Sequence, residues 1–133
     1  MSGKLVESFG VLTTLSAQRI VCCSTSNAHK VQYPDTITSL LIGVTLDTVL
    51  DTTGAIPVQL NGKAYVYFND TVTSGNLVTS DSSGRAVPFT LALTSTSISR
   101  PSAYLGVLCG PTIGGTGTIA QVLIMPGYDR ATA

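Results

Sequence analysis

Residues 56–68 read IPVQLNGKAYVYF, and this stretch decides the fold class. Its apolar residues alternate with Pro57 and Gln59, which is the period-2 pattern of a strand buried on one face. Asn61-Gly62 follows, and because both residues tolerate positive φ this dipeptide is the strongest short sequence signal for a β-hairpin. Lys63 to Phe68, rich in Val and Tyr, is predicted as the returning strand.

The same pattern extends along the chain in both directions. Runs of Val, Ile, Leu, Thr and Tyr are separated by Gly, Asn, Asp, Ser and Pro clusters about every eight to twelve residues, as in sandwiches and barrels. The predicted strands are 9–14, 18–24, 31–33, 41–46, 56–60, 63–68, 77–79, 86–87, 104–109 and 119–125. Helix formers are scarce, so at most one short helix is predicted, from Asp35 to Leu41, with Asp35 as its N-cap.

Two of the predicted strands resemble each other. Residues 41–46 (LIGVTL) and 104–108 (YLGVL) both hold Gly-Val inside an apolar run, and each is followed by a turn and another apolar strand. Glycine inside a strand, as at Gly43, marks a bulge or a close approach of backbones. Matches of this length arise either by chance or from an internal duplication, and the sequence leaves both open.

The chain is poor in charge. Charged residues are 11% of its 133 residues, Ser and Thr supply about a quarter, and the mean hydropathy is +0.38. Typical globular proteins are roughly 25% charged. Because interface centres are depleted in Lys, Glu and Asp, this composition favours a subunit that buries part of its surface in an assembly. A secreted β domain with a Ser/Thr-rich surface is the alternative.

Charge balance and hydropathy also limit the partners. Seven basic residues balance seven acidic ones, so we expect neither nucleic acid nor a membrane surface as a partner. No apolar run approaches the roughly 20 residues of a membrane span. The N-terminus lacks the pattern of a secretory signal, so we expect the chain to fold in the cytoplasm, the compartment where it is made.

Three cysteines, Cys22, Cys23 and Cys109, offer little chemistry. Neighbours in a strand point to opposite faces, so Cys22 and Cys23 are not placed to bridge. Without a CxxC pair, and with one histidine in the chain, the usual zinc ligand set is missing. All three are expected to be small buried hydrophobes in a reducing cytoplasm, with no metal and no cofactor.

Catalytic candidates are few. His29 is the only histidine, no G-x-S-x-G occurs, and residues 26–29 are predicted to form a polar turn. Most acidic residues fall in predicted turns, where Asp bonds the local backbone. Asp47 and Asp51 flank one loop, but calcium needs a denser set of oxygen ligands. We therefore expect no catalytic residue, no small-molecule substrate and no enzyme.

Three other features are expected to be structural. Gly110 to Gly117 is predicted as a flexible hairpin connection, because neither Gly-Lys-Ser/Thr nor a helix follows it as in a phosphate loop. Asn69-Asp70-Thr71 matches a glycosylation sequon, which has no use without secretion. The tyrosines lack the interleaved Lys and Arg of a base-stacking surface and are predicted as core or interface residues. They are Tyr33, Tyr65, Tyr67, Tyr104 and Tyr128.

From about Leu41 onward, the order of features resembles the small capsid cement or decoration proteins of tailed bacteriophages. The resemblance covers about two thirds of the chain, and the first forty residues depart from it. It is carried by the Gly-Val strand 42–44, Gly54 with the alternating run 56–60, VTSGNLV at 72–78 running into DSSGRA at 81–86, the second Gly-Val strand 105–107 and the apolar strand 120–125.

This resemblance implies a β-tulip-like fold and a homotrimer on the outer surface of an icosahedral capsid. There it would bind several major capsid protein subunits and reinforce the head against internal DNA pressure. The expected architecture is mostly β, a single compact barrel or sandwich. Residues 1–34 are expected as an extended N-terminal arm with the first strands, and residues 35–133 as the β body with a short C-terminal tail.

Two other functions stay open at this point. The first is a receptor- or carbohydrate-binding head of a phage tail fibre or spike, a class that is also rich in Ser, Thr and Gly. The second is an esterase or protease that uses His29.

Overall fold

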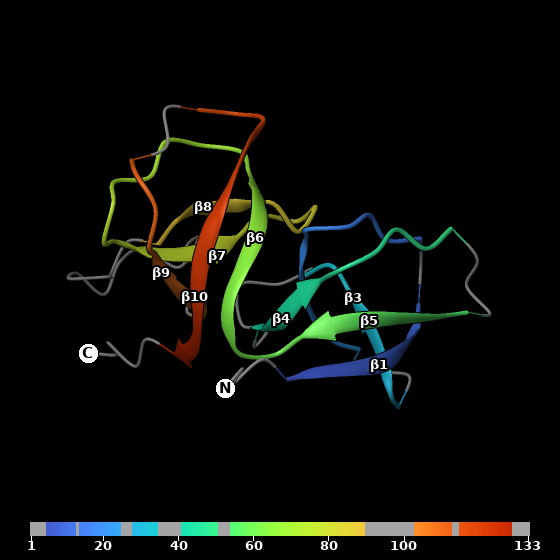
Figure 1. The fold of residues 1–133 in the computed structure, drawn as a ribbon. Helices are drawn as coiled ribbons and strands as arrows, with labels where there is room; N and C mark the ends of the chain where they lie inside the picture. The colour runs from blue at the N-terminus through green and yellow to red at the C-terminus, as the bar shows by residue number, and fades with distance from the viewer. Residues whose placement is uncertain are drawn as a thin grey trace, which may run out of the picture.

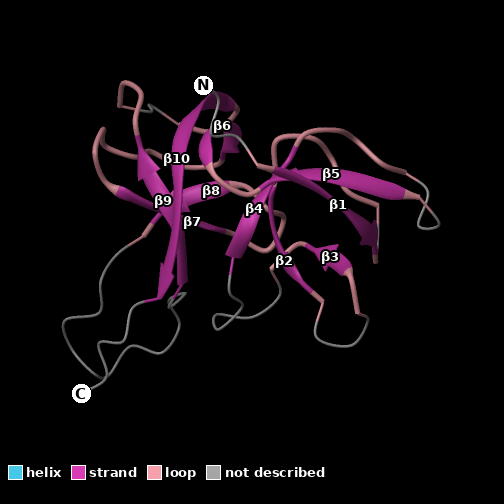
Figure 2. Cartoon of the chain, turned by 60° about the horizontal axis from the view of Figure 1, so that its bottom comes forward, coloured by secondary structure: helices cyan, strands magenta, loops and turns pink. Residues whose placement is uncertain are grey.

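The computed structural model describes residues 5–12, 14–24, 28–34, 41–50, 54–89, 103–112 and 115–128. Within these ranges it contains ten strands and no helix (Figure 2), which confirms the mostly β class. The strands are β1 (Val6–Val11), β2 (Ile20–Cys23), β3 (Lys30–Gln32), β4 (Leu41–Thr45), β5 (Ala55–Gln59), β6 (Gly62–Phe68), β7 (Leu77–Ser80), β8 (Ala86–Pro88), β9 (Ala103–Leu108) and β10 (Thr118–Tyr128).

Each predicted strand corresponds to one of these, with ends that differ by three residues or fewer. The largest differences are at β1, which begins earlier, and at β10, which runs on to Tyr128. β10 continues because an irregularity between Ile124 and Gly127 restores its pairing with β9. The predicted helix lies outside the described residues except for Leu41, which begins β4. The segment 129–133 of the predicted tail also lies outside them.

The strands form two closed five-stranded barrels that lie side by side (Figure 1). In the first barrel the order is β1-β3-β2-β4-β5, closed by the pairing of β5 with β1. In the second it is β10-β6-β8-β7-β9, closed by the pairing of β9 with β10. Closure leaves no free strand edge in either ring.

The two barrels have the same topology. If the strands of the second barrel are counted from β6, both rings read first, third, second, fourth, fifth. In each ring the first and third strands are parallel and every other pair is antiparallel. The resemblance between the two Gly-Val runs therefore reflects a repeat, because these runs form the fourth strand of each barrel, β4 and β9.

Strand registers extend the repeat to single residues. In the first barrel Val21 pairs with Gly43, and in the second Val78 pairs with Gly106. The next pairs out are Ile20 with Val44 and Leu77 with Val107. On the other side of the fourth strand, Val44 pairs with Gln59 and Val107 with Leu123. The corresponding pairs thus share their register as well as their order.

The cores of the barrels are joined. One cluster fills the first barrel and includes Val11, Val21, Val31, Ile56 and Val58. The cluster that fills the second barrel also takes in three residues of the first, and these are Ile20, Leu41 and Val44. β4 is buried on both faces for this reason, since one face closes its own barrel and the other packs on the next.

This packing corrects the expected N-terminal arm. The described residues between 5 and 34 form β1, β2 and β3, which are three of the five strands of the first barrel. Val11, Val21 and Val31 are completely buried there. These apolar side chains need the whole ring to cover them, so the segment folds with β4 and β5. The boundary between the barrels falls between Gln59 and Gly62.

The predicted hairpin at Asn61-Gly62 is wrong. β5 and β6 do not pair, because β5 lies between β1 and β4 and β6 lies between β10 and β8. Gly62 does adopt the positive φ that the dipeptide predicts, at 77°. The turn carries the chain from one barrel into the other. The predicted strands 77–79 and 86–87 do form a hairpin, because β7 and β8 pair antiparallel.

Candidate functional site

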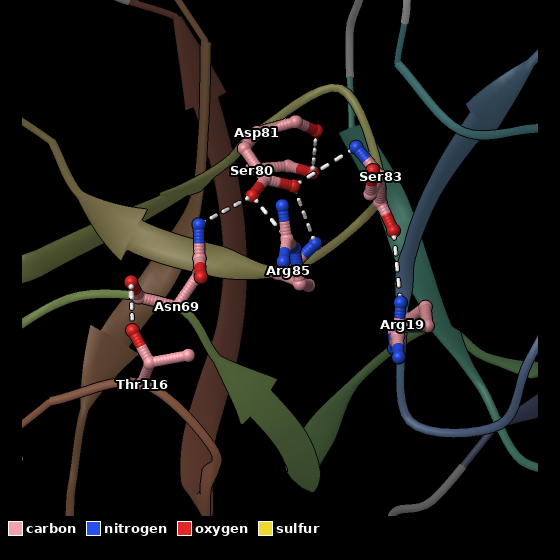
Figure 3. Close-up of polar contacts among 7 residues, drawn as sticks. All are labelled: Arg19, Asn69, Ser80, Asp81, Ser83, Arg85 and Thr116. Atoms are coloured by element: carbon pink, nitrogen blue, oxygen red, sulfur yellow. Dashed lines mark hydrogen bonds and ion pairs between the residues drawn. The ribbon is translucent and has the colours of Figure 1, made fainter.

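A polar cluster joins the barrels at the β7–β8 turn (Figure 3). Oδ1 of Asp81 accepts hydrogen bonds from the backbone N–H groups of Ser83 and Arg85, both at 2.9 Å. Its Oδ2 accepts from Nδ2 of Asn69 at 3.0 Å and from Nε of Arg85 at 2.9 Å. Asp81 therefore performs the turn chemistry that the sequence predicts for its aspartates.

Arg19 extends this cluster across the junction. Its Nη1 donates to the carbonyl oxygen of Ser83 at 3.2 Å, and its guanidinium lies 4.7 Å from the centroid of the Tyr67 ring. Two backbone bonds run beside it, from the N–H of Tyr67 to the oxygen of Gln18 and from the N–H of Ile20 to the oxygen of Gly84. Nε of Arg19 is buried and has no hydrogen-bond partner among the described residues. The arrangement fits a structural joint.

His29 is not part of such a polar cluster. Its side chain is exposed on a turn with φ of 63°, and its carbonyl oxygen accepts a hydrogen bond from Gly10 at 2.8 Å. Asp47 is exposed and accepts from the N–H of Thr48, while Asp51 lies outside the described residues.

The described ranges contain neither a metal-binding cluster nor a membrane-spanning helix. No three His, Cys, Asp or Glu side chains of those ranges gather where they would hold a metal ion. The same part of the chain has no helix of the length and hydropathy needed to cross a bilayer.

The cysteines differ from their prediction. Cys22 is buried as expected, but Cys23 and Cys109 are exposed. Cys23 follows Cys22 in β2, and alternation turns it outward. Cys109 comes after the end of β9, in the connection to β10.

The other predicted features have structural roles. β9 and β10 are antiparallel, so the glycine-rich segment between them is the hairpin connection that was predicted, although 113–114 lie outside the described residues. Asn69 of the sequon is half-buried and bound to Asp81. Its carbonyl oxygen accepts a hydrogen bond from Oγ1 of Thr116 at 3.0 Å.

Three of the tyrosines have defined contacts. The hydroxyl of Tyr33 accepts a hydrogen bond from the N–H of Ser16 at 2.8 Å. Tyr67 lies beneath Arg19, and the ring of Tyr104 meets Phe89 edge-on at 5.3 Å. Tyr65 differs from these three, because 56% of its surface is exposed to solvent. The side chain of Tyr128 lies outside the described ones.

Tyr65 belongs to an apolar surface on the second barrel, which we call the outer face. Leu77, Val107 and Leu123 form one row of it across β7, β9 and β10. Gln121, which pairs with Tyr65, and Ile119 also lie on the outer face, and the exposed Lys63, which pairs with Leu123, borders it. A hollow of ≈ 330 Å³ opens here, lined by residues that include Tyr65, Ile119, Gln121, Pro111 and Thr112.

Sequence reasoning missed this face, although its signal is present in the alternation of β6. Ala64, Val66 and Phe68 are buried, whereas Lys63 and Tyr65, which alternate with them along β6, are exposed. The alternation alone does not show which set of alternate β6 residues points into the barrel. Both sets contain large apolar or aromatic side chains.

Comparison with known proteins gives a likeness in fold. No family model matches the chain, and a search of curated proteins finds no match either. Among solved structures, the N base of the head fiber gp8.5 of bacteriophage phi29 is similar, with a TM-score of 0.66 and 16% sequence identity. The match covers 92% of this chain and 94% of that chain. At this identity the comparison shows that the fold is shared over almost the whole of both chains.

Proposed function

We propose that the chain is a structural protein of a phage virion, which decorates the outside of an icosahedral capsid by binding major capsid protein subunits. The protein acts as a homotrimer and stabilises the head. The observation that carries this proposal is the fold likeness to the base of a phage head fiber over 92% of the chain.

The surface chemistry supports the same role. The chain is 11% charged with zero formal net charge, and its outer face presents Tyr65 and Ile119 to solvent at 56% and 46% exposure. A large apolar surface on a charge-poor protein is typical of protein contacts. The two closed barrels are also held together by the apolar cluster that Ile20, Leu41 and Val44 join, which suits a protein that bridges capsid subunits.

We propose further that the protein is not an enzyme. Its only histidine is exposed on a turn, and the best-connected carboxylate, Asp81, is fully used in holding the β7–β8 turn and Asn69. A hydrolase screen with His29→Ala as the paired variant tests this. Any activity that the wild-type protein shows and the variant loses would contradict it.

Binding to particles tests the virion role directly. Purified protein is mixed with phage heads stripped of their decoration, and the heads are sedimented and imaged by cryo-electron microscopy. We expect saturable co-sedimentation and density on the outer shell, with heads that resist heat or chelator longer when decorated. Heads that stay bare at saturating protein would contradict the proposal.

The exposed Tyr65 ring favours one alternative, a carbohydrate-binding head of a tail fibre or spike. An exposed aromatic ring beside the amide of Gln121 and the hydroxyl of Thr112, over an open hollow, fits the flat apolar face and hydroxyl groups of a sugar. Glycan-array binding that Tyr65→Ser abolishes, together with no binding to heads, would favour this alternative.

A further inference from the structure

The repeat gives the outer face a counterpart on the first barrel. Counting outward from the equivalent glycines Gly43 and Gly106, the row Leu77, Val107, Leu123 corresponds to Ile20, Val44, Gln59. In the first barrel this row is completely covered, with exposures of 0%, 0% and 1%.

What covers the row of the first barrel is the second barrel. Ile20 and Val44 belong to the apolar cluster of the second barrel. Nε2 of Gln59 donates to the carbonyl oxygens of Asn61 and Lys63 at 2.8 Å, at the start of β6. A barrel of this type therefore packs the outer surface of its second, fourth and fifth strands against another barrel of the same type.

The second barrel carries the equivalent surface without a barrel to cover it. Leu77, Val107 and Leu123 keep part of their surface exposed, and all three are apolar. Beside this row the two repeats differ in side-chain size. The register places Tyr65 where the first barrel has Ser8, and Ile119 where it has Ala55. At these two positions the outer face has larger apolar or aromatic side chains than its counterpart, whereas Gln121 stands where the first barrel has Pro57 and Lys63 where it has Val6.

We propose that the outer face is the docking surface for the first barrel of a second copy of this chain. The contact continues between chains the barrel-on-barrel packing that already exists within one. This inference rests on the homotrimer of the proposed function and identifies the interface between its subunits. Because one copy gives its second barrel and the next its first, the contact is heterologous, and such contacts close into a ring when the rotation between copies permits.

The repeat itself supplies the substitutions for a test. Tyr65→Ser, Ile119→Ala and Leu123→Gln each place on the second barrel the residue that the first barrel has at the equivalent position. Tyr65→Ser is the principal variant, because its side chain is the most exposed of the outer face and contributes least to folding. Asp70→Asn is the control, since Asp70 is an exposed residue that follows β6 on the second barrel and does not belong to the outer face.

Sedimentation equilibrium or light scattering of the full chain gives the mass, and circular dichroism shows that each variant is folded. We expect the wild-type protein and Asp70→Asn to be oligomers. Tyr65→Ser should raise the dissociation constant about tenfold or more, as for an aromatic interface anchor. The triple variant should have the 13.7 kDa mass of one chain.

Three results separate this inference from the proposed function. A wild-type protein that stays at 13.7 kDa at high concentration overturns the inference, as does a folded triple variant that keeps the oligomeric mass. If the wild-type protein is a monomer but Tyr65→Ser no longer binds heads, the face docks on the capsid. The inference and the homotrimer in solution then fail, and the virion role stands. If self-association depends on the face but heads stay bare, the inference holds and the virion role fails.

Discussion

A glycine occupies the same position in the fourth strand of each barrel, and in both cases there is no room for another residue. A Cβ on Gly43 would overlap the carbonyl oxygen of Gln59, and one on Gly106 would overlap that of Leu123. Neither glycine has positive φ, so space and not backbone conformation requires it. A glycine inside a strand predicts a bulge or a close approach of backbones at Gly43, and the close approach is present at both sites.

This geometry predicts that Gly43→Ala and Gly106→Ala each lower the free energy of unfolding by about 1–3 kcal/mol or more, because the fifth strand must shift to admit the methyl group. Urea denaturation measures the change. Gly110→Ala is the control, since a Cβ there meets nothing within 4 Å, and it should change stability by about 0.5 kcal/mol or less. Equal stability of all three variants would contradict the argument.

Asp81 gives a second prediction at this scale. Asp81→Asn keeps the shape of the side chain but replaces one carboxylate oxygen with a donor, which faces donors on Asn69 or on Arg85 and Ser83. We expect a loss of about 1–3 kcal/mol in the free energy of unfolding. Asp70→Asn is the control, because Asp70 is exposed and its Oδ1 accepts a hydrogen bond from the adjacent N–H of Thr71. A loss of similar size in both variants would show that the cluster at Asp81 has no special role.

At the scale of elements, the connection from β5 to β6 shows why a local signal can be read correctly and still give the wrong pairing. Gly62 adopts the φ that Asn-Gly turns use, but β1 and β10 outcompete β6 and β5 as partners. β1 pairs with β5 over five residues, and β10 pairs with β6 over seven. The turn is followed by a change of barrel and not by a hairpin.

Gln59 fastens this connection, and its removal is a third prediction. In Gln59→Leu, which places the residue of the equivalent position Leu123, the carbonyl oxygens of Asn61 and Lys63 lose a donor. We expect the free energy of unfolding to fall by about 1–3 kcal/mol, despite the added apolar surface. Thermal unfolding followed by circular dichroism measures it. Gln121→Leu, at a half-buried surface position, is the comparison, and a gain in stability for Gln59→Leu would contradict the role assigned to the amide.

At the scale of the whole molecule, the two barrels share an apolar cluster and should unfold together. Ile56 lies in the core of the first barrel, and Ile56→Ala should cost about 2–5 kcal/mol. Because Ile20, Leu41 and Val44 pack into the second barrel, we expect amides of β6 and β10 to lose as much protection from hydrogen exchange as those of β1 and β5. Leu50→Ala should leave both sets unchanged. Loss confined to β1–β5 would show that the barrels are independent.

The positions of the strands could be predicted from the sequence alone. Ten apolar runs bounded by turn residues correspond to ten strands, since alternation and turn chemistry act over a few neighbouring residues. The sequence also determined local roles, such as the positive φ of Gly62 and the turn held by Asp81. The repeat was visible at two glycines, Gly43 and Gly106. Both barrels have glycine at this position because neither has room for a Cβ there.

Which strands pair could be seen only in the tertiary structure. The pairing forms the two rings, places residues 5–34 in a barrel and leaves the outer face on the second barrel. Pairing depends on competition between strands far apart in the chain, and that competition is settled by which arrangement buries the most apolar surface. Tyr65 illustrates the limit. Its strand was predicted from its sequence, but whether its ring faces a core or solvent depends on how the ring of strands closes.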